Sequence, residues 1–336
     1  MLTRNYFASA NGYGGFKSYF GEIFKSERFE RIYILKGGPG TGKSSMMKQL
    51  ASLAYDGGLD HEKIYCSSDP ASLDGVIIHT EHGDYAVIDG TAPHERDAVV
   101  PGAIDTLINI GANLDERLLR QRRDEILTLG VQKKGAYKSA YAVLKAAGEV
   151  SRRIRESAVA NFSYSKASDL AESLIYNTNA KSTSNTAVAL MSSFGKSGRC
   201  KIDGYHCASR VVLIREKEGT EKLFLKVLYN KYRQICSTVS FDPLDEDVDA
   251  IEIGGVLFSV TNGLDSDAID VSEMISDGSR EDTARLQETR SLLLKEAEAY
   301  FAEASRSHFE LEKIYSAAMD FEKNKIILNR IIKEIF

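Results

Sequence analysis

Hydrophobic residues near the N-terminus form a pattern that predicts a strand, a loop and a helix in direct succession. Residues 32–35 are all apolar, as expected for a buried strand of a parallel sheet. Glycines dominate residues 37–42, and in residues 45–54 apolar side chains recur on one helical face. We expect the rest of the chain to be organised around this unit.

Two further strands are predicted downstream. Residues 63–66 and 85–88 are short, mostly apolar runs, and polar residues follow both of them, namely Ser67, Ser68, Asp69 and Asp89. In open parallel sheets, ligands bind beyond the carboxyl ends of the strands, so these side chains are candidates for a ligand site. For residues 67–69 a capped turn is an equally good interpretation, because turn-forming residues surround Asp69.

Long helical segments are predicted for much of the remaining chain. A helix is expected to begin after Pro101, and three- and four-residue apolar spacing predicts helices at 115–129, 136–154 and 281–336. Residues 177–208 are small and polar, which indicates a domain boundary. The sequence therefore predicts an α/β fold in two domains: 1–180, with a helical extension at about 103–178, and 181–336, which ends in long helices.

Composition narrows the class of protein. With 336 residues and 43% apolar side chains, the chain can bury two cores. A net charge of −5 gives no basic field for nucleic acid. The four cysteines are sparse, and no apolar run approaches the ~18 residues that suggest a membrane span, so we expect a reduced, cytoplasmic protein.

Residues 37–44, which we call the glycine loop, fit the phosphate-binding pattern G-x-x-x-x-G-K-[ST] in its required strand and helix context. Glycines allow consecutive amides to face a phosphate, and the helix N-terminus adds partial positive charge. Lys43 is expected to contact the β- and γ-phosphates, and Ser44 to bind Mg²⁺. The predicted nucleotide-binding residues are Gly37, Gly38, Pro39, Gly40, Thr41, Gly42, Lys43, Ser44 and Ser45.

Asp89 has the position of the second element of such a site, a carboxylate at a strand end that binds Mg²⁺ directly or through water. The next residue is Gly90, where many ATPases carry a glutamate that activates water. Fast hydrolysis is therefore not expected, unless Asp69, Asp74 or His94 acts as the base.

The C-terminal half contains a second copy of this pattern. Residues 210–215 resemble residues 31–36, and in the same register residues 219–222 lie over residues 40–43. With one six-residue shortening, two more pairs of segments align: 68–70 with 241–243, and 85–90 with 258–263. We interpret this as an internal duplication.

The second copy has lost the residues that would bind phosphate and metal. Its replacements are Glu216 for Gly37, Glu221 for Gly42, Leu223 for Ser44 and Asn262 for Asp89. Carboxylates would repel phosphates in a partly dry site. We therefore expect this half to keep the scaffold and to bind no nucleotide.

Several runs resemble an uncharacterised bacterial family of P-loop ATPases with two tandem P-loop halves, found mostly in spore-forming Gram-positive lineages. The runs are residues 35–44, 66–69, 89–94, 101–102 and the spaced set of His308, Leu311, Glu312, Tyr315, Met319, Asp320 and Phe321. The resemblance implies a P-loop NTPase three-layer fold with mostly parallel sheets. It also implies ATP binding through residues 37–44, with Asp89 on Mg²⁺. The sequence departs from the family in its degenerate second loop.

The expected function is Mg²⁺-dependent binding of ATP, with GTP as an alternative, and slow hydrolysis stimulated by a protein partner. Lys43 and Asp89 are the expected catalytic residues. A second hypothesis is a small-molecule kinase, with Asp69 or Asp74 as base, and a third is a nucleotide-sensing scaffold without turnover.

Overall fold

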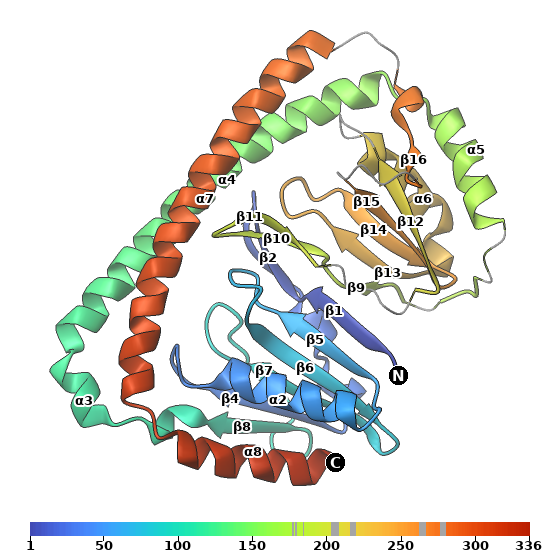
Figure 1. Cartoon of the computed structure of the whole chain (residues 1–336). Coiled ribbons are helices and arrows are strands. Elements are labelled where there is room, and N and C mark those ends of the chain that lie inside the picture. Colours follow the sequence, from blue (N-terminus) through green and yellow to red (C-terminus); the bar gives the residue numbers. More distant parts are fainter. Residues whose placement is uncertain are drawn as a thin grey trace. The chain divides into compact units, whose positions relative to one another are not determined.

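The computed structural model describes residues 1–176, 178, 180–183, 185–202, 208–215, 220–261, 267–275 and 280–336. These residues form two compact units, each containing a β-sheet (Figure 1). The first unit comprises residues 1–8, 18–140 and 299–336; the second comprises residues 9–17 and 141–298. This grouping differs from a division at a single point of the chain, because the last helices pack with the first sheet.

The described residues of the first unit form a six-stranded mixed sheet. Its strands, in spatial order, are β1 (Thr3–Phe7), β5 (His61–Tyr65), β6 (Leu73–Thr80), β7 (Gly83–Asp89), β4 (Arg31–Lys36) and β8 (Asp105–Asn109). Strand β6 is antiparallel to both of its neighbours, β5 and β7, and the other pairings are parallel. The fold is therefore α/β, with mixed sheets in which parallel pairings outnumber antiparallel ones.

Helices α2 (Lys43–Asp56) and α8 (Phe321–Ile335) cover one face of this sheet. Met47 of α2 and Leu328 of α8 share a core with Val87 of β7. The opposite face carries the short helix α1 (Phe20–Ile23) and the 3₁₀ turn η1 (Ser26–Arg28). There Phe24 lies against Gly75, whose neighbour Val76 points to the α2 side because side chains alternate along a strand.

The second unit repeats the topology of the first. Its strands, in spatial order, are β9 (Ala187–Val188), β13 (Cys236–Phe241), β14 (Val248–Ile253), β15 (Val256–Thr261), β12 (Arg210–Arg215) and β16 (Ile269–Asp270). Parallel and antiparallel pairings follow in the same order as in the first sheet. Helix α6 (Thr220–Tyr232) follows β12 as α2 follows β4. Identical order and direction are what an internal duplication would produce.

Each sheet is accompanied by a helix from the other half of the chain. After β8, the turn η2 (Ile110–Asn113) leads to Leu114, which forms a bridge with Met319, just before α8. After β16, the turn η4 (Ser272–Met274) leads to Ile275, which forms a bridge with Phe162, just before α5 (Tyr164–Ile175). Helix α5 then packs in the core of the second unit. The two halves have thus exchanged their terminal helices.

Three local predictions were wrong. Residues 105–109 form β8 instead of a helix, since three apolar residues cannot distinguish the two and pairing with β4 decides. Strand β6 was missed, because Asp74 and Gly75 look like turn residues. The two helices predicted at 115–129 and 136–154 are a short helix, α3 (Glu116–Gln121), and one continuous helix, α4 (Arg123–Ala160).

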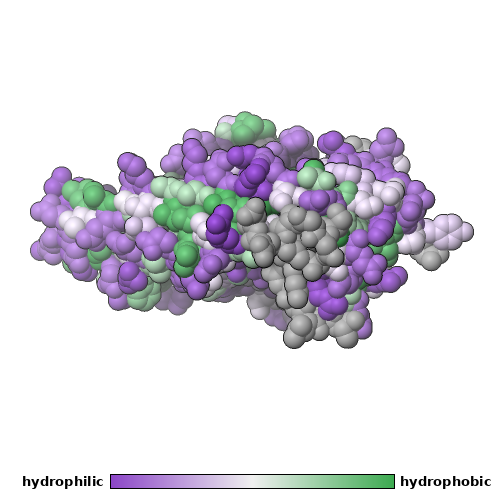
Figure 2. Space-filling view, turned by 90° about the horizontal axis from the view of Figure 1, so that it is seen from above, coloured by the Kyte–Doolittle hydropathy of each residue, from purple (hydrophilic) through white to green (hydrophobic). Residues whose placement is uncertain are grey.

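The remaining elements complete the two units. Helix α7 (Arg280–Ala317) contributes residues to both units, as α4 does. In the second unit, the hairpin of β2 (Ser9–Gly12) and β3 (Gly15–Ser18) lies beside the hairpin of β10 (Ser192–Gly195) and β11 (Gly198–Lys201). Hydrophilic residues cover most of the face seen in Figure 2. Among the described residues, none of the helices combines the length and apolarity that crossing a membrane requires.

Candidate functional site

The glycine loop connects the carboxyl end of β4 to the first residue of α2, as predicted. Gly40 and Gly42 have φ values of 68° and 87°, in the left-handed region that residues with a Cβ rarely adopt. Gly42 is the N-cap of α2, and Lys43 is its first helical residue. The two positive φ values allow the chain to turn sharply into the helix.

The amide groups of residues 40–45 have no hydrogen-bond acceptor in the described part of the protein. Among the described residues, none of the amides of residues 40–45 donates a hydrogen bond to another protein group; the first that does so is Met46, whose N–H lies 3.0 Å from the Gly42 carbonyl oxygen. Amides at the start of a helix carry partial positive charge and need an external acceptor. This arrangement can bind an anion.

Lys43 is almost entirely buried beneath the loop. Its Nζ donates to the carbonyl oxygens of Gly37 and Gly38, at 2.8 Å each, and lies 3.6 Å from Oδ2 of Asp89. The ammonium group is therefore held at the base of the loop and faces a carboxylate. A cation in this position can neutralise an anion held by the loop amides.

Asp89 lies directly beside the strand that leads into the loop. Strand β7 pairs in parallel with β4, and Leu35 is the residue opposite Asp89. The N–H and hydroxyl of Thr91 both donate to Oδ1 of Asp89, at 2.9 and 2.6 Å. The sequence could not reveal this adjacency, which brings the Asp89 carboxylate to Lys43, the residue before Ser44.

The donor set at this point suits magnesium better than a protein-held transition metal. Among the described residues, no group of three or more His, Cys, Asp and Glu side chains could hold a metal ion. Ser44 and Asp89 supply one hydroxyl and one carboxylate. Magnesium commonly binds to one or two protein oxygens, with water and substrate phosphates as its other ligands. The Ser44 hydroxyl also accepts a hydrogen bond from the N–H of Leu73, at 2.9 Å.

Asp74 and His94, two of the candidate bases, lie together. His94 Nε2 is 2.9 Å from Asp74 Oδ2, and both side chains are buried. The imidazole stacks on the ring of Phe20, with 4.4 Å between ring centroids. Burial on both partners favours a structural role for this pair over proton transfer to a bound substrate.

The residue after Asp89 is Gly90, and the structure has no room for a side chain at this position. A Cβ at Gly90 would overlap Cγ2 of Ile34 in the neighbouring strand. Asp69 lies in a turn, where its carboxylate accepts from the N–H of Ala71 at 3.2 Å and its carbonyl oxygen accepts from Ser72. Strands β6 and β7 separate its strand from β4. The capped-turn interpretation of residues 67–69 fits this geometry.

Helix α4 brings two side chains to the same edge of the sheet that were not among the candidates. The Tyr137 hydroxyl donates to Ser68 Oγ at 3.1 Å, and Lys133 Nζ lies 3.0 Å from His308 Nδ1 of α7. Burial lowers the pKa of Lys133. The Lys133 side chain is partly buried. In the sequence, Lys133 is distinguished by its position four residues, or one helical turn, before Tyr137.

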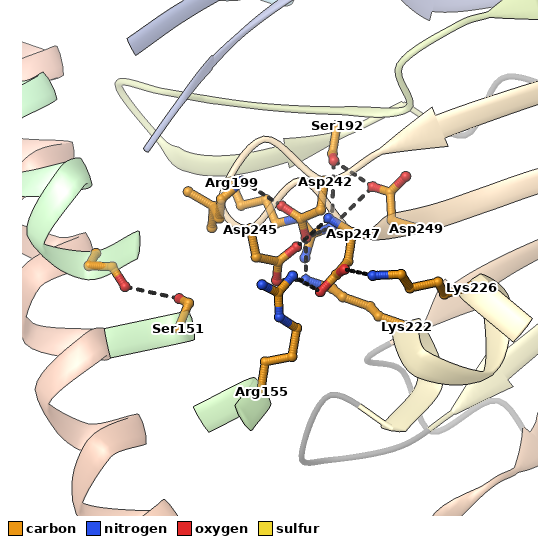
Figure 3. Close-up of polar contacts among 12 residues, drawn as sticks. Ser151, Arg155, Ser192, Arg199, Lys222, Lys226, Asp242, Asp245, Asp247 and Asp249 are labelled. Atoms are coloured by element: carbon orange, nitrogen blue, oxygen red, sulfur yellow. Dashed lines mark hydrogen bonds and ion pairs between the residues drawn. The ribbon is translucent and has the colours of Figure 1, made fainter. Parts of the chain in front are cut away.

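The corresponding lysine of the second unit is fully engaged with carboxylates (Figure 3). Lys222 Nζ is 2.7 Å from Oδ2 of Asp242 and also contacts Asp245. Arg199 donates to the same Asp242 oxygen, at 2.8 Å. Burial alone would lower the pKa of Lys222, but these carboxylates raise it above its ordinary value. Burial opposes ionisation of Asp242, but Arg199 and Lys222 hold its pKa below the usual range.

The other substitutions of the second copy are described only in part. Glu221 is buried in the first turn of α6, and Leu223 belongs to the core of the second unit. Glu216 and Asn262 lie outside the described residues. The second unit thus carries two carboxylates on its lysine, and an apolar side chain where Ser44 stands in the first.

Comparisons with protein-family models, with curated proteins and with solved structures found no match for this chain.

Proposed function

We propose that this chain binds Mg²⁺–ATP at the glycine loop and hydrolyses it slowly. The observation that carries the proposal is the group of amides at residues 40–45, which have no protein acceptor among the described residues and lie above the buried ammonium group of Lys43. Backbone donors at a helix N-terminus, together with a lysine, are the elements that hold the phosphates in P-loop proteins.

Each residue of the loop then has a distinct role. The amides hold the oxygens of the β-phosphate, and Lys43 neutralises charge on the β- and γ-phosphates. To do so, the ammonium group exchanges its contact with Asp89, at 3.6 Å, for contacts with phosphate. Ser44 and Asp89 would hold magnesium, which neutralises phosphate charge when it is bound.

Slow turnover follows from the surroundings of Asp89. Gly90 has no space for a side chain, and the candidate acid–base pair of Asp74 and His94 is buried. Asp69 follows a strand that β6 and β7 separate from β4, so none of the described candidate bases is an exposed group beside Asp89. A protein partner that contributes or exposes such a group would accelerate hydrolysis.

The same proposal includes membership in the P-loop ATPase family with two tandem halves. The identical strand order of the two units supports it. The ion pairs that occupy Lys222 support the idea that the second unit binds no nucleotide.

Titration calorimetry of the full chain with ATP, with and without Mg²⁺, tests the proposal. We expect one site per chain, loss of binding in Lys43→Ala, and ADP formed without an added acceptor. Binding equally strong in Lys43→Ala would overturn the site. Phosphate transferred to a metabolite would instead identify a kinase, and binding without any turnover would identify a nucleotide-sensing scaffold.

A further inference from the structure

A segment of the C-terminal half, residues 312–324, packs against the outside of the glycine loop. It comprises the last turns of α7, the connection to α8 and the start of α8. Both this segment and the loop belong to the first unit. They are nevertheless more than 260 residues apart in sequence.

Two side chains of the segment hold carbonyl oxygens of the loop. Ser316 Oγ donates to the carbonyl oxygen of Gly40 at 2.8 Å, and Asn324 Nδ2 donates to that of Thr41 at 2.8 Å. Asn324 is buried, and its Oδ1 accepts a hydrogen bond from Asn113 Nδ2 at 3.0 Å. Asn113 thereby fixes which end of the Asn324 amide faces the loop.

Anchoring these carbonyls also directs the amides of the following residues. In a trans peptide the carbonyl of one residue and the N–H of the next point in opposite directions from the same plane. A carbonyl of Gly40 held by Ser316 turns the N–H of Thr41 away from the segment. A carbonyl of Thr41 held by Asn324 does the same for the N–H of Gly42. These are two of the amides that have no protein acceptor among the described residues.

The same segment explains why the loop requires glycine on its outer side. A Cβ on Gly38 would lie 3.2 Å from the ring of Tyr315, and one on Gly42 would lie 3.3 Å from the ring of Phe321. A Cβ on Gly40 would overlap the carbonyl oxygen of Glu312. The segment therefore fits closely around the loop backbone and limits its movement.

We propose that Ser316 and Asn324 are positioning residues for the nucleotide site, so that the C-terminal half completes the site of the N-terminal half. This inference rests on the proposed function, since it specifies how the loop amides are aimed at phosphate. It also makes the end of α7 sensitive to the ligand. If the segment favours the loop conformation that binds nucleotide, then by thermodynamic linkage nucleotide binding also stabilises the segment.

The test compares Asn324→Ala and Ser316→Ala with two matched controls in the full chain. Asn329→Ala removes an exposed amide from the same helix, and Ser291→Ala removes a hydroxyl of α7 that bonds to Gln287 within the helix. We expect each test variant to bind Mg²⁺–ATP on the order of tenfold more weakly, the effect of one lost hydrogen bond. The controls should bind as the wild type does and, like Ser316→Ala, should melt near the wild-type temperature without nucleotide. Asn324→Ala should melt at a lower temperature, because it leaves the Thr41 carbonyl and the Asn113 amide without their buried partner.

Hydrogen exchange of the wild type gives a second readout that a purely structural role would not move. Mg²⁺–ATP should slow exchange in a peptide spanning residues 312–324 and leave residues 164–175 of α5 unchanged. The effect should vanish in Lys43→Ala. Wild-type affinity in both test variants, or exchange at 312–324 that ATP does not alter, would overturn the inference while leaving the proposed function intact. A wild type that binds no nucleotide would overturn both.

Discussion

Lys43 Nζ and Asp89 Oδ2 lie 3.6 Å apart at the base of the glycine loop, with the two residues contributed by α2 and β7. Both side chains are largely buried, so the pair is partly shielded from solvent screening. The carboxylate holds a compensating negative charge beside the ammonium group until an anion takes its place. Substitutions of the two residues should have different effects: changing Lys43 should weaken binding of the phosphates, and changing Asp89 should weaken the effect of magnesium.

Asp89→Asn should remove most of the effect of magnesium on ATP affinity. The amide keeps the size of the side chain but loses the charge that attracts a divalent cation. We expect the gain in affinity on adding Mg²⁺ to fall by about tenfold or more, a conservative figure for one metal contact. Calorimetry with Mg²⁺ and with a chelator measures it. Asp97→Asn, which removes an exposed carboxylate paired with Lys36, is the control and should keep the full Mg²⁺ effect.

Lys222→Met should destabilise the protein and leave ATP affinity unchanged. The substitution leaves the buried carboxylates of Asp242 and Asp245 with one cation fewer. Removing one partner of a buried ion pair costs about 3–5 kcal/mol, and Arg199 should hold the loss near the lower figure. Urea unfolding measures the stability and calorimetry the affinity. Weaker ATP binding by correctly folded Lys222→Met would contradict the assignment of the second unit as a non-binding copy.

Stability should fall between pH 6.5 and pH 9 because of His79. The hydrogen bond to Glu62, together with Asp84, raises the pKa of His79 from 6.5 to about 9. Since the folded pKa is the higher one, the stabilisation is complete below pH 6.5 and is lost as the pH rises through 9. After discounting for partial exposure, we expect a loss of about 2 kcal/mol.

Urea unfolding of the wild type and of His79→Gln at pH 6 and pH 9.5 checks this. The variant should be less stable at pH 6, and its stability should change less across the interval. Parallel pH profiles for the two proteins would show that His79 is not the group responsible.

Gly90→Ala should lower stability without accelerating ATP hydrolysis. The added methyl group would overlap Ile34 in the neighbouring strand, and overpacking of this kind costs about 1–3 kcal/mol. Gly21→Ala is the matched control, because no atom lies within 4 Å of the position of its Cβ. Thermal unfolding and ADP release measure the two effects. A Gly90→Ala variant as stable as the wild type would mean that this side of Asp89 has room for a side chain.

The sequence was most informative where structure is local. The succession of β4, glycine loop and α2 follows from residues 31–56 alone, since apolar spacing, glycines and the lysine lie in one continuous stretch. The similarity of the two halves was also visible in part. The hairpin turns between β6 and β7 and between β14 and β15 place Tyr85 and Phe258 at equivalent positions, as the alignment predicted. Across the sheet, however, Tyr85 lies opposite Arg31 and Phe258 opposite Val212, which is two residues away from the predicted register.

What could not be predicted depends on contacts between distant residues. The neighbours of β4 are fixed by hydrogen bonds across the sheet, which leave no mark in the sequence of Asp89 or of residues 105–109. Residues 130–135 were expected to separate two helices, yet Gly130 and Gly135 both lie inside α4, with open space where a Cβ would stand. Asn324 and Ser316 were not predicted as site residues, because only the folded structure shows that they contact the glycine loop.

The exchange of α5 and α8 bears on how such a chain could have arisen and how it can be divided. Two identical subunits that exchange their terminal helices would give the same arrangement, in which the helix that covers each sheet comes from the other half. Severing the polypeptide near residue 180 would leave each fragment with an uncovered apolar face, so the fragments should regain nucleotide binding only when mixed.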